Sequence, residues 1–115
     1  MFDFEKLTVY NKARETRKLL FSVMAGHKRL DRIVADQLKR AMLSVMLNIA
    51  EGTGKSGKAD KKNFFTIARG SCYETIAIMD VLLDDGIING DEYKQLYANF
   101  EEISKMLLGL INSVR

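Results

Sequence analysis

Apolar side chains recur at steps of three and four residues along most of the chain, which is the spacing of one face of an α-helix. This pattern predicts four helices, over residues 4–25, 31–53, 59–85 and 90–114. No segment alternates apolar and polar residues as a strand does, and no proline interrupts a helix. Long helices with short links favour an all-α fold, an antiparallel up-down-up-down four-helix bundle that fills residues 1–115 as a single domain.

Residues typical of helix ends stand at several of these boundaries. Asp3 is expected to cap the first helix, and Gly26 is expected to end it. Gly86 is expected to stop the third helix. Asn89 and Glu92, three residues apart, match a capping box at the start of the fourth helix.

The helix expected over residues 31–53 is apolar on two sides. One stripe has the alternating three- and four-residue steps of a bundle core: Val34, Leu38, Ala41, Val45 and Ile49. Leu43 and Leu47 fall on the opposite side. Because a helix in a monomeric bundle needs only one apolar face, Leu43 and Leu47 predict a subunit interface.

A polar stripe also runs along this helix: Gln37, Arg40, Ser44, Asn48 and Glu51. This helix is expected to lie beside the third helix. Asn48 and Glu51 lie on its flank, and Ser71 and Glu74 hold similar positions on the third helix. The four groups predict a polar network that fixes helix register or a subunit contact. The alternative interpretation is ordinary boundary positions that face water.

Glycines gather in residues 52–58, GTGKSGK, which are expected to form a loop, with Ser56 or Asp60 capping the next helix. The loop matches G-x-G-x-x-G and ends like a phosphate-binding loop, although Ile49 stands where the latter needs glycine. Both nucleotide motifs follow a strand, whereas a helix is expected here, so these are chance matches. Gly70, inside the third helix, predicts a close approach to a neighbouring helix, because glycine there costs up to about 1 kcal/mol relative to alanine.

The sequence shows no catalytic or metal-binding constellation. His27 is the single histidine, and it lacks the Glu-x-x-His spacing of di-iron bundles and the partners of a catalytic triad. Cys72 lies on the apolar face of the third helix and is expected to be a small core residue. We therefore predict no catalytic residue, no metal and no cofactor. Enzyme activity would require a partner that supplies the catalytic residues.

The net charge of +3 is unevenly distributed. Residues 1–62 hold 14 Lys and Arg against 7 Asp and Glu, a net of +7, and residues 63–115 hold 4 against 8, a net of −4. This asymmetry favours contact with a polyanion or between complementary subunits; solvated helix faces are the alternative. With one cysteine, no signal-peptide pattern and no apolar run near the ~20 residues of a membrane span, the protein is expected to be cytoplasmic and to bind no membrane.

Two groups of basic residues are candidate phosphate contacts. The loop and the start of the third helix carry four lysines, offset by Asp60 alone: Lys55, Lys58, Lys61 and Lys62. The first helix carries three cations beside its apolar stripe: Arg14, Arg17 and Lys18. Contacts from these side chains to RNA or DNA would give an affinity that falls with salt. The alternative is an exposed, solvated loop.

Several blocks of the chain resemble the bacterial four-helix-bundle proteins encoded in intervening sequences of 23S ribosomal RNA genes. The blocks are QLKRA at 37–41, NIAEG at 48–52, Phe64, IARGS at 67–71 with Glu74, and the segment 103–111. The resemblance covers nearly the whole chain. It implies a four-helix bundle that assembles into a homopentamer. The family is similar to the accessory protein of diversity-generating retroelements, a basic pentameric bundle that associates with nucleic acid and a reverse transcriptase.

The leading hypothesis is a non-enzymatic, oligomeric four-helix-bundle protein that associates with RNA or DNA through basic surface residues. Its expected partners are further copies of itself, nucleic acid and, in some settings, another protein. The alternative hypothesis is a structural or protein-interaction module that binds no nucleic acid. The apolar second face of the helix over 31–53 supports either hypothesis.

Overall fold

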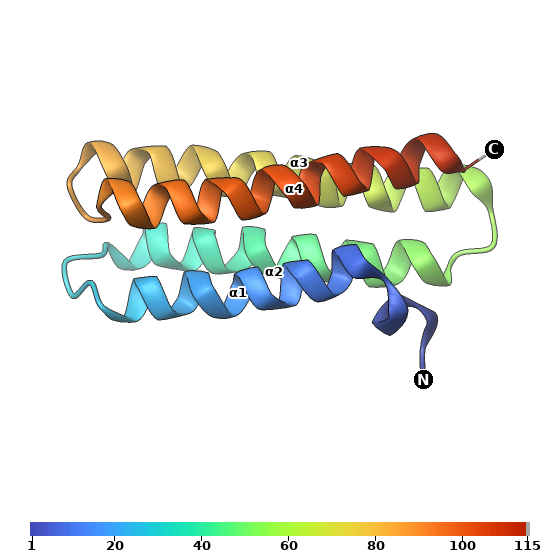
Figure 1. Cartoon of the computed structure of the whole chain (residues 1–115), viewed down its shortest axis with the longest axis horizontal. Helices are drawn as coiled ribbons and strands as arrows, with labels where there is room; N and C mark the ends of the chain where they lie inside the picture. The colour runs from blue at the N-terminus through green and yellow to red at the C-terminus, as the bar shows by residue number, and fades with distance from the viewer. Residues whose placement is uncertain (115) are drawn as a thin grey trace.

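The computed structural model describes residues 1–114, which form four antiparallel helices (Figure 1). The elements are a short 3₁₀ helix η1 (Asp3–Lys6), α1 (Thr8–Ala25), α2 (Arg32–Gly54), α3 (Lys58–Asp84) and α4 (Gly90–Ser113). The described residues contain no strand. The prediction of an all-α four-helix bundle is confirmed.

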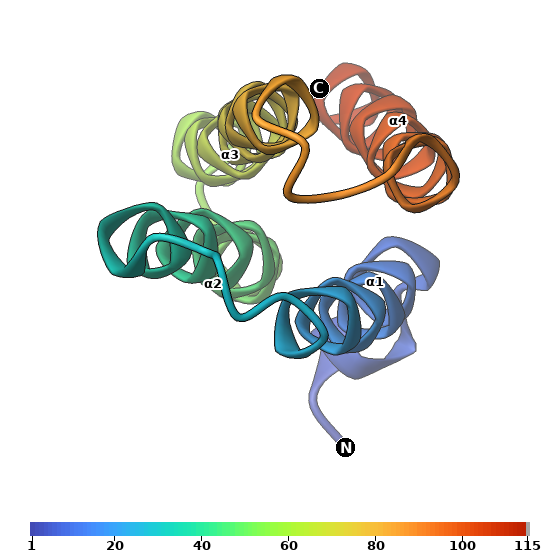
Figure 2. The same ribbon diagram turned by 90° about the vertical axis from the view of Figure 1, so that its left-hand side faces the viewer.

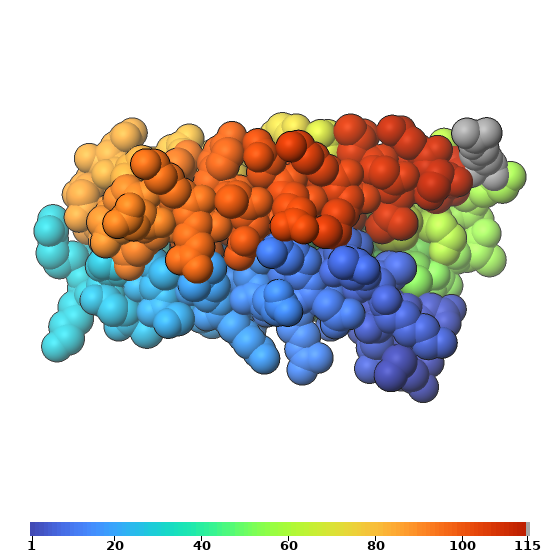
Figure 3. Space-filling model, viewed as in Figure 1, coloured from blue at the N-terminus to red at the C-terminus, as the bar shows by residue number. Residues whose placement is uncertain are grey.

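The helices form a square when viewed along the bundle, with each helix beside the next and α1 beside α4 (Figure 2). The α2–α3 pair packs most extensively. In the space-filling view, α1 and α4 meet along much of their length, where an ion pair joins Lys12 Nζ to Glu102 Oε2 at 3.3 Å (Figure 3). The α2–α3 link lies at the same end as the N-terminus and the end of α4, and the α1–α2 and α3–α4 links lie at the opposite end (Figure 1).

The core is a continuous apolar cluster to which all four helices contribute. Leu20, Met42, Met79 and Phe100 are among its fully buried members. The two buried threonines do not leave a hydroxyl unpaired; for instance, Thr75 Oγ1 donates to the Ser71 carbonyl at 2.8 Å. Within residues 1–114, no helix has both the length and the apolar character needed to cross a membrane.

The chain's first turn differs from the expected helix over 4–25. Residues Asp3–Lys6 form a 3₁₀ helix, Leu7 is extended, and α1 begins only at Thr8. Glu5 accepts a hydrogen bond from the Phe2 amide at 3.0 Å, which closes this first turn on itself. The prediction that Asp3 caps the first long helix is therefore wrong, because a separate turn intervenes.

The two glycines that are predicted to end helices adopt different backbone conformations. Gly26 follows α1 with φ −79°, so the left-handed conformation expected of a terminal glycine is absent there. Gly86 does adopt it, with φ +70°, and the Ile87 amide donates to the Leu82 carbonyl at 2.8 Å. The prediction that Gly86 stops α3 is confirmed.

Gly70 faces open space in the described chain. A Cβ built at this position meets no heavy atom within 4 Å, so the predicted close approach to a neighbouring helix is wrong within one chain. We expect Gly70→Ala to raise the free energy of unfolding by about 0.5–1 kcal/mol, because alanine restricts the unfolded chain and favours the helix. Urea denaturation measures the change. A loss of stability would show that the Cβ meets an obstacle in the folded protein.

The predicted capping box at α4 is confirmed. Asn89 Oδ1 accepts from the Glu92 amide at 2.8 Å, and Glu92 Oε1 accepts from the Asn89 amide at 2.9 Å. His27 Nε2, in the α1–α2 link, lies 3.1 Å from Glu92 Oε2, which ties this link to the first turn of α4. The Asn89 hydrogen bond, followed by the His27 interaction, holds the pKa of Glu92 below its ordinary value.

A carboxyl group whose pKa is lowered by folding stabilises the fold above its unfolded-state pKa, roughly 4.3 for glutamate, and this contribution is lost as pH falls through the lower folded-state pKa. We therefore expect Glu92→Gln to cost about 0.5–1 kcal/mol at pH 7, since glutamine keeps the hydrogen bonds but not the charge at the helix N-terminus. Urea denaturation should show that the stability gap between the wild type and the variant is smaller at pH 3 than at pH 7. Glu15→Gln, on the exposed side of α1, is the control. An equal gap at both pH values would exclude charge as the cause.

Candidate nucleic-acid interface

The α2–α3 link is shorter than the predicted loop over 52–58. Helix α2 continues to Gly54, and α3 begins at Lys58, which leaves only residues 55–57 between them. The residue that precedes α3 is Gly57, and no side chain caps it, so the predicted cap by Ser56 or Asp60 is wrong. The link and the first turn of α3 form the lysine tip, which we define as Lys55, Lys58, Lys61 and Lys62.

Lys61 differs from the other lysines of the tip. Its Nζ donates to the carbonyl oxygens of Gly52 at 3.1 Å and Thr53 at 2.9 Å. These carbonyls belong to the last turn of α2, where the helix leaves acceptors unpaired and carries partial negative charge. Lys61 therefore serves as a cap for α2, and its charge is partly used inside the chain.

The remaining lysines of the tip are exposed. Lys55 Nζ lies 5.2 Å from the centroid of the Phe64 ring, a distance that allows a cation–π contact. Lys58 and Lys62 flank the start of α3, whose free amide groups add positive potential. Phe65, beside them, points into the core.

The second predicted group of cations lies on α1, a different element from the lysine tip. Arg14 and Lys18 are exposed, and the guanidinium carbon of Arg17 lies 4.3 Å from the centroid of the Phe21 ring. Within residues 1–114, no carboxylate oxygen lies within 4.0 Å of a charged nitrogen of any of the seven predicted cations. These cations are therefore not neutralised by ion pairs in the described part of the chain.

The predicted polar network is divided into two parts between α2 and α3. Ser44 Oγ lies 2.8 Å from Ser71 Oγ, and Asn48 Nδ2 donates to Ser44 Oγ at 3.0 Å. Separately, Gln37 Nε2 donates to Glu74 Oε1 at 2.9 Å.

Glu51 is exposed and belongs to neither part in residues 1–114. Ser44 and Gln37 were absent from the predicted set, although both lie on the polar stripe of the sequence. The helical spacing of that stripe was therefore the signal that could have found them.

Leu43 and Leu47 are 49% and 51% exposed on the outer side of α2. Ile33, also on α2, is 80% exposed, and Ile67 and Val81 of α3 are 43% and 49% exposed. The bundle thus leaves apolar side chains of both helices in contact with water.

Two further kinds of site to consider in the described residues are a metal site and a reactive cysteine. Within residues 1–114, no three His, Cys, Asp or Glu side chains come together as a metal site requires. Cys72 is 1% exposed, and burial raises the pKa of its thiol to about 12. The thiol is therefore protonated at neutral pH, and the interpretation of Cys72 as a core residue is confirmed.

A family model described as 23S rRNA-intervening sequence protein matches residues 5–109, which is most of the chain. The chain belongs to this family. The resemblance seen in the sequence is thereby confirmed.

Among solved structures, a protein of unknown function from the S23 ribosomal protein family of Bacteroides thetaiotaomicron is similar to this chain, with a TM-score of 0.83 and 23% sequence identity. The match covers 92% of this chain and 100% of that one. At this identity, the likeness shows the fold alone. No curated protein sequence matches the chain. Neither the 23S rRNA-intervening sequence family nor the similar structure is described as an enzyme.

Proposed function

We propose that this member of the 23S rRNA-intervening sequence family is a non-enzymatic, oligomeric bundle that associates with nucleic acid through its basic surface. The observation that carries the proposal is the lysine tip, where Lys55, Lys58 and Lys62 are exposed beside the N-terminus of α3 without a carboxylate partner in residues 1–114. Arg14 and Lys18 provide a second exposed basic group on α1.

Such a surface binds the phosphate backbone rather than base edges. Each lysine that neutralises a phosphate releases a condensed counterion, so affinity falls as salt rises. Phosphate contacts fix position without reading sequence. The proposed binding is therefore strongly salt-dependent and weakly sequence-dependent. RNA and DNA both carry this backbone, so both are tested.

The direct test is fluorescence anisotropy of the purified wild-type protein with labelled RNA, single-stranded DNA and duplex DNA, measured across a salt series. We expect binding at low salt whose affinity declines linearly on a log–log plot. Absence of binding at low salt, or an affinity that salt does not change, would overturn the proposal.

Assembly into a homo-oligomer, which the family resemblance implies is a pentamer, is the second part of the proposal. The exposed Leu43 and Leu47 support it, because an interface would remove them from water. Light scattering on a size-exclusion column should give five times the 13.1 kDa chain mass. A single species at the chain mass would refute assembly. A double Leu43→Gln, Leu47→Gln variant should shift an oligomer toward smaller species.

The alternative function is a structural or protein-interaction module. The exposed apolar residues of α2 and α3 favour it as well, since they would suit another protein. The two functions differ in the anisotropy experiment: a protein that assembles normally but binds no nucleic acid at low salt would support the alternative.

A further inference from the structure

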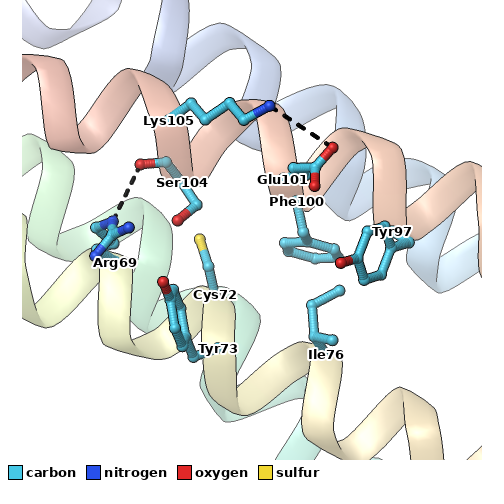
Figure 4. A pocket seen from close by; sticks show the side chains of 9 residues that line it. All are labelled: Arg69, Cys72, Tyr73, Ile76, Tyr97, Phe100, Glu101, Ser104 and Lys105. Carbon is cyan, nitrogen blue, oxygen red and sulfur yellow. Dashed lines mark hydrogen bonds and ion pairs between the residues drawn. The ribbon is translucent and has the colours of Figure 1, made fainter.

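A groove lies between α3 and α4, apart from the lysine tip and from the basic residues of α1 (Figure 4). It encloses about 360 Å³, which is near the lower end of the range of small-ligand sites. Its floor is apolar: Cys72 and Phe100 are each 1% exposed, and Ile76 extends the same surface.

Two tyrosines contribute aromatic surface to the groove, one from each helix. Tyr73 of α3 is 59% exposed, and Tyr97 of α4 is 41% exposed. Large aromatic rings at the rim of an apolar depression are the usual platform on which an unpaired base stacks. They contact any base, since every base has a π-face.

Two cations line the groove: Arg69, beside Tyr73, and Lys105, whose side chain extends toward Glu101 (Figure 4). Arg69 Nε donates to the Ser104 carbonyl at 3.3 Å, and its guanidinium carbon lies 5.1 Å from the centroid of the Tyr73 ring. These two contacts hold the guanidinium at the groove's edge. Lys105 has a 77% exposed side chain, and its Nζ is 3.9 Å from Glu101 Oε1. Two cations against one carboxylate leave the lining of the groove with a net charge of +1.

We propose that the α3–α4 groove binds one nucleotide unit, with the base on the apolar floor against Tyr73 or Tyr97 and the phosphate at Arg69 and Lys105. The cations and the aromatic side chains of the lining match the two parts of a nucleotide. A neutral apolar ligand would leave both cations unused. A base in a duplex is stacked and paired, so the groove takes only an unpaired nucleotide.

The bound nucleotide unit could come from two sources, a free mononucleotide or an unpaired residue of a nucleic-acid strand. The second source rests on the proposed nucleic-acid function, and it would add a preference for single strands to the sequence-independent contacts of the lysine tip. The first source does not depend on that function. The two are separated by testing adenosine monophosphate and oligonucleotides in parallel.

The mononucleotide arm follows the tyrosine ring resonances of the wild-type protein by NMR while adenosine monophosphate is added. We expect the Tyr73 and Tyr97 rings to shift with saturation, and the Tyr10 ring, on α1, to remain in place. Tyr73→Leu and Tyr97→Leu should each weaken binding about tenfold, because leucine keeps the surface apolar but removes stacking. Both side chains are substantially exposed, so the fold should persist, as circular dichroism verifies.

Charge variants test the orientation of the ligand. Lys105→Met should weaken binding of adenosine monophosphate about fivefold and leave adenosine unchanged, because adenosine has no phosphate. Glu101→Gln should strengthen binding of adenosine monophosphate by removing a repulsive carboxylate. Lys39→Met, at an exposed position of α2 that does not line the groove, is the matched control and should change neither ligand. Equal losses for adenosine and adenosine monophosphate would overturn the placement of the phosphate.

The oligonucleotide arm compares a single strand with its duplex. If the groove accepts an unpaired base of the strand, Tyr73→Leu weakens single-strand binding and leaves duplex binding unchanged. If single-strand binding is unaffected while lysine-tip variants lose both ligands, the strand source is refuted and the proposed function stands. If the wild-type protein binds neither polymer, the proposed function fails. The NMR titration then decides the groove by itself, and absence of any tyrosine shift with adenosine monophosphate overturns the inference.

Discussion

Gly52→Ala is expected to lower the free energy of unfolding by about 1–3 kcal/mol, the usual cost of overpacking a close-packed interior. A Cβ at this position would lie 2.8 Å from Phe65 Cε1, 2.9 Å from Phe65 Cδ1 and 3.1 Å from Phe64 Cβ. The Phe65 ring is 3% exposed, so it cannot swing into solvent to make room. The last turn of α2 and the first turns of α3 would have to move apart.

Gly54→Ala is the matched control for this prediction. Gly54 belongs to the same last turn of α2, yet a Cβ there meets no heavy atom within 4 Å. It should leave stability unchanged or raise it by up to about 1 kcal/mol. Urea denaturation of the two variants measures the difference directly. Equal stabilities would show that the α2–α3 contact at Gly52 adjusts without cost.

The overall bundle could be predicted because periodicity depends only on the order of apolar residues. The four core stripes required no knowledge of which helix neighbours which. The roles of the glycines could not be predicted in the same way. The sequence predicts a loop at Gly52 and a close approach at Gly70, but the structure buries Gly52 against Phe65 and leaves Gly70 open. Close approach depends on the separation of two helices, and local sequence does not specify it.

The candidate nucleic-acid interface also has some features that the sequence predicts and others that it does not. The exposure of Lys58 and Lys62 follows from their position in the polar, lysine-rich start of α3, which the sequence indicates. The sequence does not indicate that Lys61 caps α2, because the cap requires the end of one helix and the first turn of the next to meet at hydrogen-bond distance. Ser44 was recognised as a member of a stripe, but its bond to Ser71 depends on the rotation of α2 against α3.

Replacing Lys55, Lys58 and Lys62 together with glutamine is expected to weaken binding to nucleic acid on the order of tenfold or more and to flatten its salt dependence. Each lost phosphate contact reduces the slope of log affinity against log salt by about 0.9 for duplex DNA and about 0.7 for single strands. Anisotropy across the salt series gives both quantities. The fold should be little changed, since all three side chains are exposed and the Lys55 contact with Phe64 is a surface one.

A second triple variant, Lys28→Gln, Lys39→Gln and Lys94→Gln, changes the net charge by the same amount at exposed positions elsewhere. If the two triple variants lose equal affinity, the binding depends on overall charge and the lysine tip is not a specific contact surface. Lys61→Gln is expected to affect stability more than binding. It should lower the free energy of unfolding by about 0.5–1.5 kcal/mol through loss of the α2 cap and reduce the salt slope less than loss of an exposed lysine does. A Lys61 variant that keeps its stability but loses binding would reverse the division of roles within the tip.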